Sequence, residues 1–285
     1  MAEEAPTSAR ATAGTNGTAG ARRIAQALAR AHAEGRIALV PYVVAGYPDA
    51  AIGRQAALAA IDAGADLLEL GLPYSDPLAD GTTLQRASAA ALRAGATFER
   101  SLELLADVHA ARPDTPVVPM AYVNQALGRG DPADALGRLA EAGASGVILA
   151  DLTPDEGEPI EAAARQAGLA VVYLVTPTTP PARRAMVASR TGGFLYAVSL
   201  VGVTGARDRL PATVGRFVHE TRALSPVPVA VGFGVSRPAH VRRLARAGAD
   251  GVIVASALVD ALGPDGRDVD SMARLVTALL GATGG

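Results

Sequence analysis

Short apolar runs alternate with longer Ala/Leu/Arg-rich segments of helical period along almost the whole chain. This alternation is typical of βα units and of a parallel sheet. Eight runs have the composition of strands, at residues 37–44, 66–72, 116–121, 146–150, 170–174, 193–198, 227–231 and 250–254. Eight is the strand count of a closed (β/α)8 TIM barrel, which is the α/β architecture that we predict. A doubly wound open sheet is the alternative, and it would need a reversal of strand order.

Helical segments are predicted after each strand, at residues 49–63, 83–94, 132–142, 155–167, 181–190, 212–224, 237–247 and 269–280. Two more helices are expected, one at 21–33 that would cover the barrel floor and one at 98–110. Several helices end in a Gly-containing turn such as DAGAD or RAGADG, where glycine supplies a left-handed C-cap. No linker divides the chain, so we predict a disordered polar tail over residues 1–20 and a single catalytic barrel domain over residues 21–285.

Missing residue types narrow the chemistry. All 26 basic residues are arginine, so no lysine can form an imine with a substrate or anchor pyridoxal phosphate. There is no cysteine, and the four histidines fall in helical segments without ligand spacing, so we predict neither a metal nor a cofactor. A net charge of −2 argues against a nucleic-acid or membrane-surface partner. The polar N-terminus lacks a signal peptide and no apolar run reaches membrane-spanning length, which predicts a cytoplasmic protein.

One carboxylate interrupts the apolar strand predicted at residues 66–72, which reads DLLELGL. Because side chains alternate along a strand, Leu67, Glu69 and Gly71 share one face, and we expect that face to point into the barrel. Glu69 also lies near the C-terminal end of its strand, where barrel enzymes keep their catalytic groups. Burial there predicts a raised pKa for Glu69 and a role as acid or base near neutral pH. The alternative is a buried glutamate paired with an arginine, but no predicted strand carries one.

A second carboxylate, Asp80, follows in the loop YSDPLADGTT. Asp-Pro and Asp-Gly pairs favour turns, so a purely structural role is one interpretation. The loop also comes directly after the strand that carries Glu69. We therefore predict that Asp80 closes over the same substrate and accepts a hydrogen bond from a substrate N–H group.

Two glycine-rich segments near the C-terminus predict a phosphate site. Gly234 lies in VGFGVS after the seventh strand, and Ser256 follows the eighth strand as the expected N-cap of a short helix. Loops after strands seven and eight are the usual phosphate-binding positions of a TIM barrel, although a tight turn and an ordinary cap would look the same. The loop after strand six, SLVGVTGAR, is a candidate lid in which Gly205 completes the phosphate cradle and Thr204 meets Asp80; a plain flexible loop is the alternative.

The motifs PYVVAGYP, LELGLPYSDPLADG, LVTPTTP, VSLVGVTGAR and VGFGVSRP, in this order, resemble the tryptophan synthase alpha chain family from about residue 22 to 280. The resemblance implies a lyase that cleaves indole-3-glycerol phosphate by a retro-aldol reaction and passes indole to a beta chain carrying pyridoxal phosphate. It implies that Glu69 is the acid/base and that Asp80 holds the indole N–H. It also implies that Tyr196 lines the site and that Thr204 and Gly205 belong to the closing loop. Phosphate binding is implied for Gly205, Gly234, Ala255 and Ser256.

Several positions depart from the family pattern. Thr82, Gln125 and Thr153 stand where the family usually has proline. Ala255 stands where the family usually has glycine. The resemblance places Pro77, Asn124 and Thr153 where members of the family meet the beta chain. The departures near Asn124 and Thr153 therefore bear more on the partnership than on the chemistry.

Three functions follow as hypotheses. The first is a tryptophan synthase alpha chain that works with a beta chain. It predicts that adding the beta chain strongly activates indole release. The second is a stand-alone lyase that releases free indole for secondary metabolism. The third is a non-catalytic, ligand-binding regulatory subunit, which would not need both carboxylates.

Overall fold

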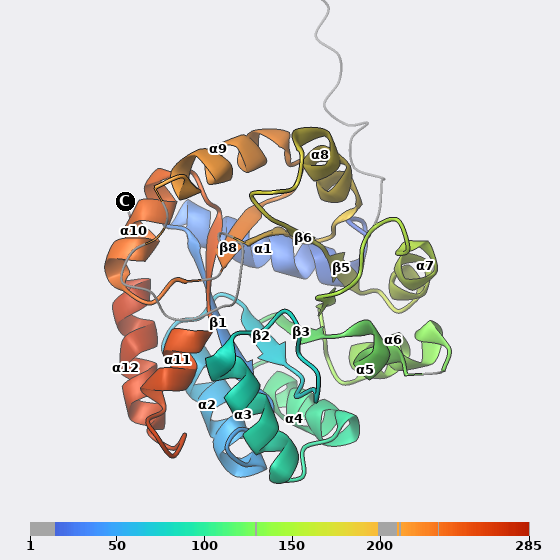
Figure 1. Cartoon of the computed structure of the whole chain (residues 1–285), viewed down its shortest axis with the longest axis vertical. Helices are drawn as coiled ribbons and strands as arrows, with labels where there is room; N and C mark the ends of the chain where they lie inside the picture. Colours follow the sequence, from blue (N-terminus) through green and yellow to red (C-terminus); the bar gives the residue numbers. More distant parts are fainter. Residues whose placement is uncertain (1–14, 129, 199–209, 211, 233, 285) are drawn as a thin grey trace, which may run out of the picture.

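The computed structural model describes residues 15–128, 130–198, 210, 212–232 and 234–284 (Figure 1). Most of the tail predicted at residues 1–20 lies outside these residues. Within them, the strands are all parallel and form one sheet in the order β5-β4-β3-β2-β1-β9-β8-β7-β6. Their bounds are β1 (Ala38–Val44), β2 (Leu68–Gly71), β3 (Val117–Ala121), β4 (Gly146–Leu149), β5 (Ala170–Val172), β6 (Leu174–Val175), β7 (Leu195–Val198), β8 (Val229–Gly232) and β9 (Gly251–Val254).

The fifth predicted strand is divided into two pieces. β5 pairs with β4, β6 pairs with β7, and only Tyr173 separates β5 from β6. The Tyr196 N–H donates to the Tyr173 carbonyl at 3.0 Å, so the ladder to β7 starts at Tyr173 itself. One continuous stretch of chain thus joins the two ends of the sheet and completes the ring. The predicted TIM barrel is confirmed, with strand five interrupted.

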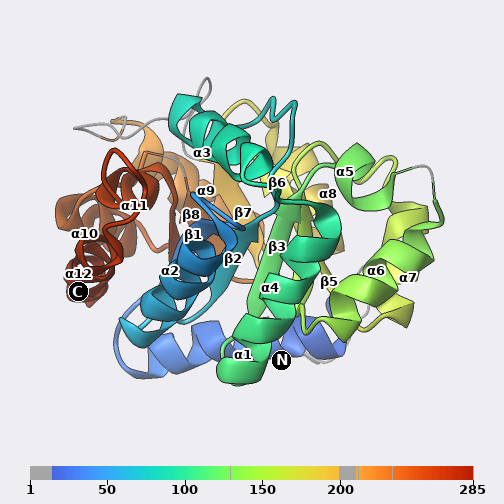
Figure 2. The same ribbon diagram turned by 90° about the horizontal axis from the view of Figure 1, so that it is seen from below.

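Helices surround the ring of strands (Figure 1). Their bounds are α1 (Ala19–Ala33), α2 (Ala50–Asp62), α3 (Thr82–Arg93), α4 (Phe98–Ala111), α5 (Val123–Leu127), α6 (Pro132–Glu141), α7 (Glu158–Gln166), α8 (Pro181–Arg190), α9 (Val214–Leu224), α10 (Pro238–Arg246), α11 (Ser256–Ala261) and α12 (Val269–Leu280). α1 runs across the end of the barrel where the strands begin, as expected for the floor (Figure 2). The short helix α5 was not predicted. None of the described helices is long and apolar enough to cross a lipid bilayer.

Turns at the floor set where the strands start. Gly64, Gly143 and Gly248 end the helices before β2, β4 and β9 with φ of 104°, 96° and 85°, which confirms the predicted left-handed caps. Asp66 follows the first of these turns, and its carboxylate accepts the Leu39 N–H at 2.8 Å and pairs with Arg36 at 2.7 Å. These contacts anchor the lower ends of β1 and β2. The register of the two strands then determines which of their side chains face the interior at the opposite end of the barrel.

Candidate active site

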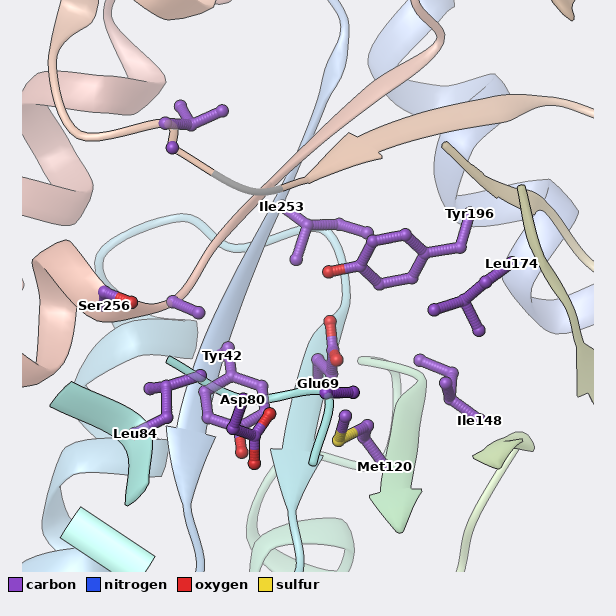
Figure 3. A pocket seen from close by; sticks show the side chains of 14 residues that line it. Tyr42, Glu69, Asp80, Leu84, Met120, Ile148, Leu174, Tyr196, Ile253 and Ser256 are labelled. Carbon is purple, nitrogen blue, oxygen red and sulfur yellow. The ribbon is translucent and has the colours of Figure 1, made fainter. Parts of the chain in front are cut away.

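A pocket opens inside the barrel at the end where the strands finish, with about 620 Å³ of free space including its mouth. Residues from eight strands or the segments that follow them meet there (Figure 3). The described lining residues are Tyr42, Glu69, Ala79, Asp80, Leu84, Met120, Ile148, Leu174, Tyr196, Gly234, Val235, Ile253, Ala255 and Ser256.

Glu69 points into this pocket from β2, as its place in the strand predicts. Its neighbours Leu68 and Leu70 are fully buried on the opposite face of the strand. Glu69 is 2% exposed, and its Oε2 atom has no hydrogen-bond partner. None of the ion pairs among the described residues involves it, so the structural alternative of a Glu–Arg pair has no support there. Burial, followed by the nearby charge of Asp80, raises the pKa of Glu69 to about 8, which confirms the expected direction.

Asp80 reaches the pocket from the loop between β2 and α3. Its N–H donates to the Pro77 carbonyl at 3.0 Å, so the predicted turn exists. The turn does not expose the side chain, however, because Asp80 is only 5% exposed. Burial raises the pKa of Asp80 to about 7. The loop therefore brings a second carboxylate into the same apolar surroundings as Glu69.

Two buried tyrosines face the carboxylates. In Figure 3 the Glu69 carboxylate points toward the Tyr196 hydroxyl, and Asp80 lies beside the Tyr42 ring. Burial is the main cause that raises the pKa of both phenols well above the ordinary value; among the charges, Glu69 acts most on Tyr196 and Asp80 most on Tyr42. Both hydroxyls consequently stay protonated. Tyr196 was predicted to line the site, whereas Tyr42 was missed.

Strand register could have identified Tyr42. Tyr42 pairs with Glu69 across the β1–β2 ladder, so both side chains lie at the same level and on the same face. Each ring also needs a glycine beside it. A Cβ atom on Gly71 would lie 1.9 Å from the Tyr42 hydroxyl oxygen, and one on Gly232 would lie 2.5 Å from that of Tyr196. The two glycines therefore make room for the phenols.

The rest of the wall is apolar, from Leu84, Met120, Ile148, Leu174 and Ile253. The sequence did not distinguish these residues from ordinary core residues, because they too lie on buried strands and helices. Together with the two tyrosine rings, they suit a flat aromatic ligand whose single polar edge meets a carboxylate.

The predicted phosphate residues line the pocket on another side. Gly234 has φ +77°, and Ala255 and Ser256 follow β9. One detail of the prediction is wrong. Ala255, not Ser256, is the N-cap of α11, and no side chain caps that helix, because the helix starts one residue earlier than expected. Thr204 and Gly205 lie outside the described residues.

Three predicted partner-interface residues lie on the rim around the pocket: Pro77 in the loop after β2, Asn124 in α5 after β3, and Thr153 in the loop after β4. Asn124 and Thr153 are exposed and Pro77 is half-buried. Next to Pro77, the Leu78 side chain is 92% exposed. The role of this rim as a partner site stays a prediction.

The comparisons with known proteins agree with this geometry. The sequence model of the family "Tryptophan synthase alpha chain" matches residues 28–282. The tryptophan synthase alpha chain of Deinococcus radiodurans is 45% identical over 92% of this chain and 96% of its own length, and that of a Roseiflexus species is 44% identical over 91% and 99%. Among solved structures, Mycobacterium tuberculosis tryptophan synthase superimposes with a TM-score of 0.84 at 36% identity, covering 92% of this chain and 98% of that one. The alpha subunit of Legionella pneumophila superimposes with a TM-score of 0.83 at 30% identity, covering 92% and 98%.

Proposed function

The chain belongs to the tryptophan synthase alpha chain family, and we propose that Glu69 and Asp80 carry the reaction of this family in its barrel. The reaction is the cleavage of indole-3-glycerol phosphate to indole and glyceraldehyde 3-phosphate, which makes the chain a carbon–carbon lyase of tryptophan biosynthesis. The observation that carries the proposal is the unpaired, buried Glu69 carboxyl beside a second buried carboxyl in an apolar pocket. The comparisons give no support to the stand-alone lyase or to the non-catalytic subunit.

The chemistry requires an acid at one edge of the indole ring and an anion at another. Protonation of ring carbon C3 turns indole into a leaving group, because the resulting indolenine accepts the electrons of the breaking carbon–carbon bond. Positive charge then develops at the ring nitrogen. Glu69 supplies the proton to C3, and the Asp80 carboxylate accepts the ring N–H and stabilises that charge.

The two pKa values suit this division of labour. Between about pH 7 and 8, Asp80 is ionised while Glu69 still holds its proton. The glycerol hydroxyl must also lose a proton to a base. Tyr42 and Tyr196 are poor candidates, because their pKa values are raised and the phenols stay protonated. Among the described residues that line the pocket, this leaves the two carboxylates as the base, and Glu69 becomes available as soon as it has protonated C3. The reaction moves one proton from oxygen to carbon and needs no redox group.

The phosphate end of the substrate is assigned to the loops after β8 and β9. Gly234, Ala255 and Ser256 line the pocket there, and we assign their backbone N–H groups to the phosphate. No arginine or histidine is among the described lining residues. We assign Gly205 to the same cradle and Thr204 to loop closure, on the family resemblance.

The partner is a tryptophan synthase beta chain that receives the indole. We propose that it docks on the rim formed by Pro77, Asn124 and Thr153, next to the exposed Leu78. A cytoplasmic location remains a prediction from the sequence.

The test is steady-state indole release by the purified chain from indole-3-glycerol phosphate, with and without a beta chain. We expect slow release by the chain alone and strong activation by the partner. High activity that the partner does not change would instead support the stand-alone lyase. No release in either case would contradict the proposed function.

A further inference from the structure

The turn that follows β3 holds the Asp80 loop, defined here as residues 73–80, near both of its ends. At the end of the loop, the Ala79 N–H donates to the Tyr122 hydroxyl oxygen at 2.9 Å. At its beginning, the Gln125 side-chain amide donates to the Pro73 carbonyl at 2.6 Å. The two side chains that make these hydrogen bonds come from one short segment, Tyr122–Gln125, at the start of α5.

The two side chains also brace each other and the loop. The Gln125 Oε1 atom accepts the backbone N–H of Tyr122 at 3.4 Å, which fixes the orientation of the amide that reaches Pro73. The Tyr122 ring stacks on the Tyr74 ring of the loop, with 5.1 Å between centroids and 27° between planes. Tyr122 is itself 4% exposed, so its position is set by the barrel and not by solvent.

The Asp80 loop has few other attachments. Among the hydrogen bonds of the described residues, another ties it to the rest of the chain, from the Gln85 side-chain amide to the Asp80 carbonyl at 2.9 Å, and the Tyr122 hydroxyl also interacts with the Asp80 backbone. The remaining ones join residues within the loop, such as Leu78 to Asp76. With Leu78 92% exposed, the middle of the loop gains little from packing. The position of the Asp80 carboxyl therefore depends on contacts made from outside the loop.

We propose that Tyr122 and Gln125 are positioning residues that hold Asp80 against the ring nitrogen of the substrate. This inference rests on the proposed function, since it assigns a task to the same site. Neither residue touches the reacting atoms in this scheme. They act through the backbone at Ala79 and Pro73, which sets the depth of Asp80 in the pocket. A catalytic carboxylate displaced by about 1 Å can lose up to about a hundredfold in rate.

Two variants separate the contacts. Tyr122→Phe keeps the ring and its stacking on Tyr74 and removes the hydroxyl that meets the backbone at Ala79 and Asp80. Gln125→Ala removes the bond to Pro73. For each we expect kcat to fall about tenfold or more, while KM changes less than about threefold, because the phosphate loops are untouched. We also expect the acid limb of the pH–rate profile to move to lower pH, because a loop that swings outward returns Asp80 to water and lowers its raised pKa.

Matched controls remove the same groups elsewhere. Tyr173→Phe deletes a buried hydroxyl that donates to Glu161 at 2.7 Å, and Gln55→Ala deletes an exposed amide on α2. Both should keep the acid limb and kcat of the parent chain, even where Tyr173→Phe lowers stability. A shift of the acid limb in the controls as large as in Tyr122→Phe would overturn the proposal.

Hydrogen exchange tests the contact without using activity. The Ala79 amide should be protected in the parent chain and should exchange at least about tenfold faster in Tyr122→Phe. If the parent amide exchanges at the open-chain rate, or if exchange rises while kcat and the acid limb stay unchanged, the positioning role is wrong. A parent chain that releases no indole would overturn the proposed function instead, and the exchange comparison would still report whether the contact exists.

Discussion

Replacing Glu69 by glutamine is expected to abolish turnover and, at alkaline pH, to stabilise the fold. Glutamine has nearly the shape of glutamate but carries no proton that it can release to C3. Positioned acid–base groups contribute about a hundredfold to ten-thousandfold in rate, so kcat should fall at least about a hundredfold while substrate still binds. Retained turnover would refute the assignment of the acid.

The stability effect follows from the raised pKa of Glu69. Between its ordinary value of 4.5 and about 8, the folded chain keeps a proton on Glu69 that the unfolded chain has already released. The folded state thus binds more protons than the unfolded state, and the free energy of unfolding falls as pH rises through this window. The difference between 4.5 and about 8 corresponds to a loss of about 5 kcal/mol, complete only above the folded-state pKa.

Glutamine removes this pH dependence but adds a smaller penalty of its own. Glu69 Oε2 has no hydrogen-bond partner, so an amide in its place leaves a buried polar group unsatisfied, at about 1–3 kcal/mol. We therefore expect Glu69→Gln to be less stable than the parent near pH 5 and more stable, by about 2–4 kcal/mol, near pH 9.

Urea unfolding at both pH values measures the effect directly. Glu103→Gln, on the exposed side of α4, is the matched control and should follow the parent at both. If Glu69→Gln and the parent lose stability in parallel between pH 5 and 9, the carboxyl is not desolvated in the folded chain. The electrostatic part of the argument would then be wrong.

Three further predictions follow from the site. In the parent chain, kcat/KM should be bell-shaped with its maximum between about pH 7 and 8, because activity needs Asp80 ionised and Glu69 protonated; a profile flat from pH 5 to 9 would exclude this pair. Asp80→Asn should lower kcat by about a hundredfold to a thousandfold, because the lost carboxylate faces the ring nitrogen. Inhibition by inorganic phosphate should stay unchanged. A rise in the inhibition constant that matches the loss of kcat would place Asp80 at the phosphate instead. Gly232→Ala should cost about 1–3 kcal/mol of stability in urea unfolding and lower kcat/KM, because the new methyl group would meet the Tyr196 hydroxyl at 2.5 Å; unchanged stability and kinetics would show that the ring is free to move.

Much of the site could be predicted from the sequence because strand periodicity is a local property. Alternation along residues 66–72 placed Glu69 on the inner face, and its position near the end of the strand placed it at the level of the pocket. The loop with Asp80 and the glycine-rich segments around Gly234 and Ser256 were located by their motifs. In each case, residues adjacent in sequence carried the information.

Local sequence patterns could not predict features that depend on the pairing of neighbouring strands or on single hydrogen bonds between distant residues. Tyr42 was missed because its importance lies in its register opposite Glu69, a pairing between strands. The short helix α5 and the reach of Tyr122 and Gln125 to the Asp80 loop were missed for the same reason. The N-cap of α11 was misplaced by one residue, since both Ala255 and Ser256 are compatible with a helix start.

The sequence by itself determined the order and number of βα units, the inner face of the strand that carries Glu69, and the exclusion of lysine and cysteine chemistry. Only the tertiary structure decided how acidic the two carboxyls are and how firmly Asp80 is held. A periodic pattern specifies which way a side chain points, because that depends on its own backbone. Its pKa and position depend on desolvation and contacts supplied by other strands, so Glu69 acquires its raised pKa only when the ring closes around it.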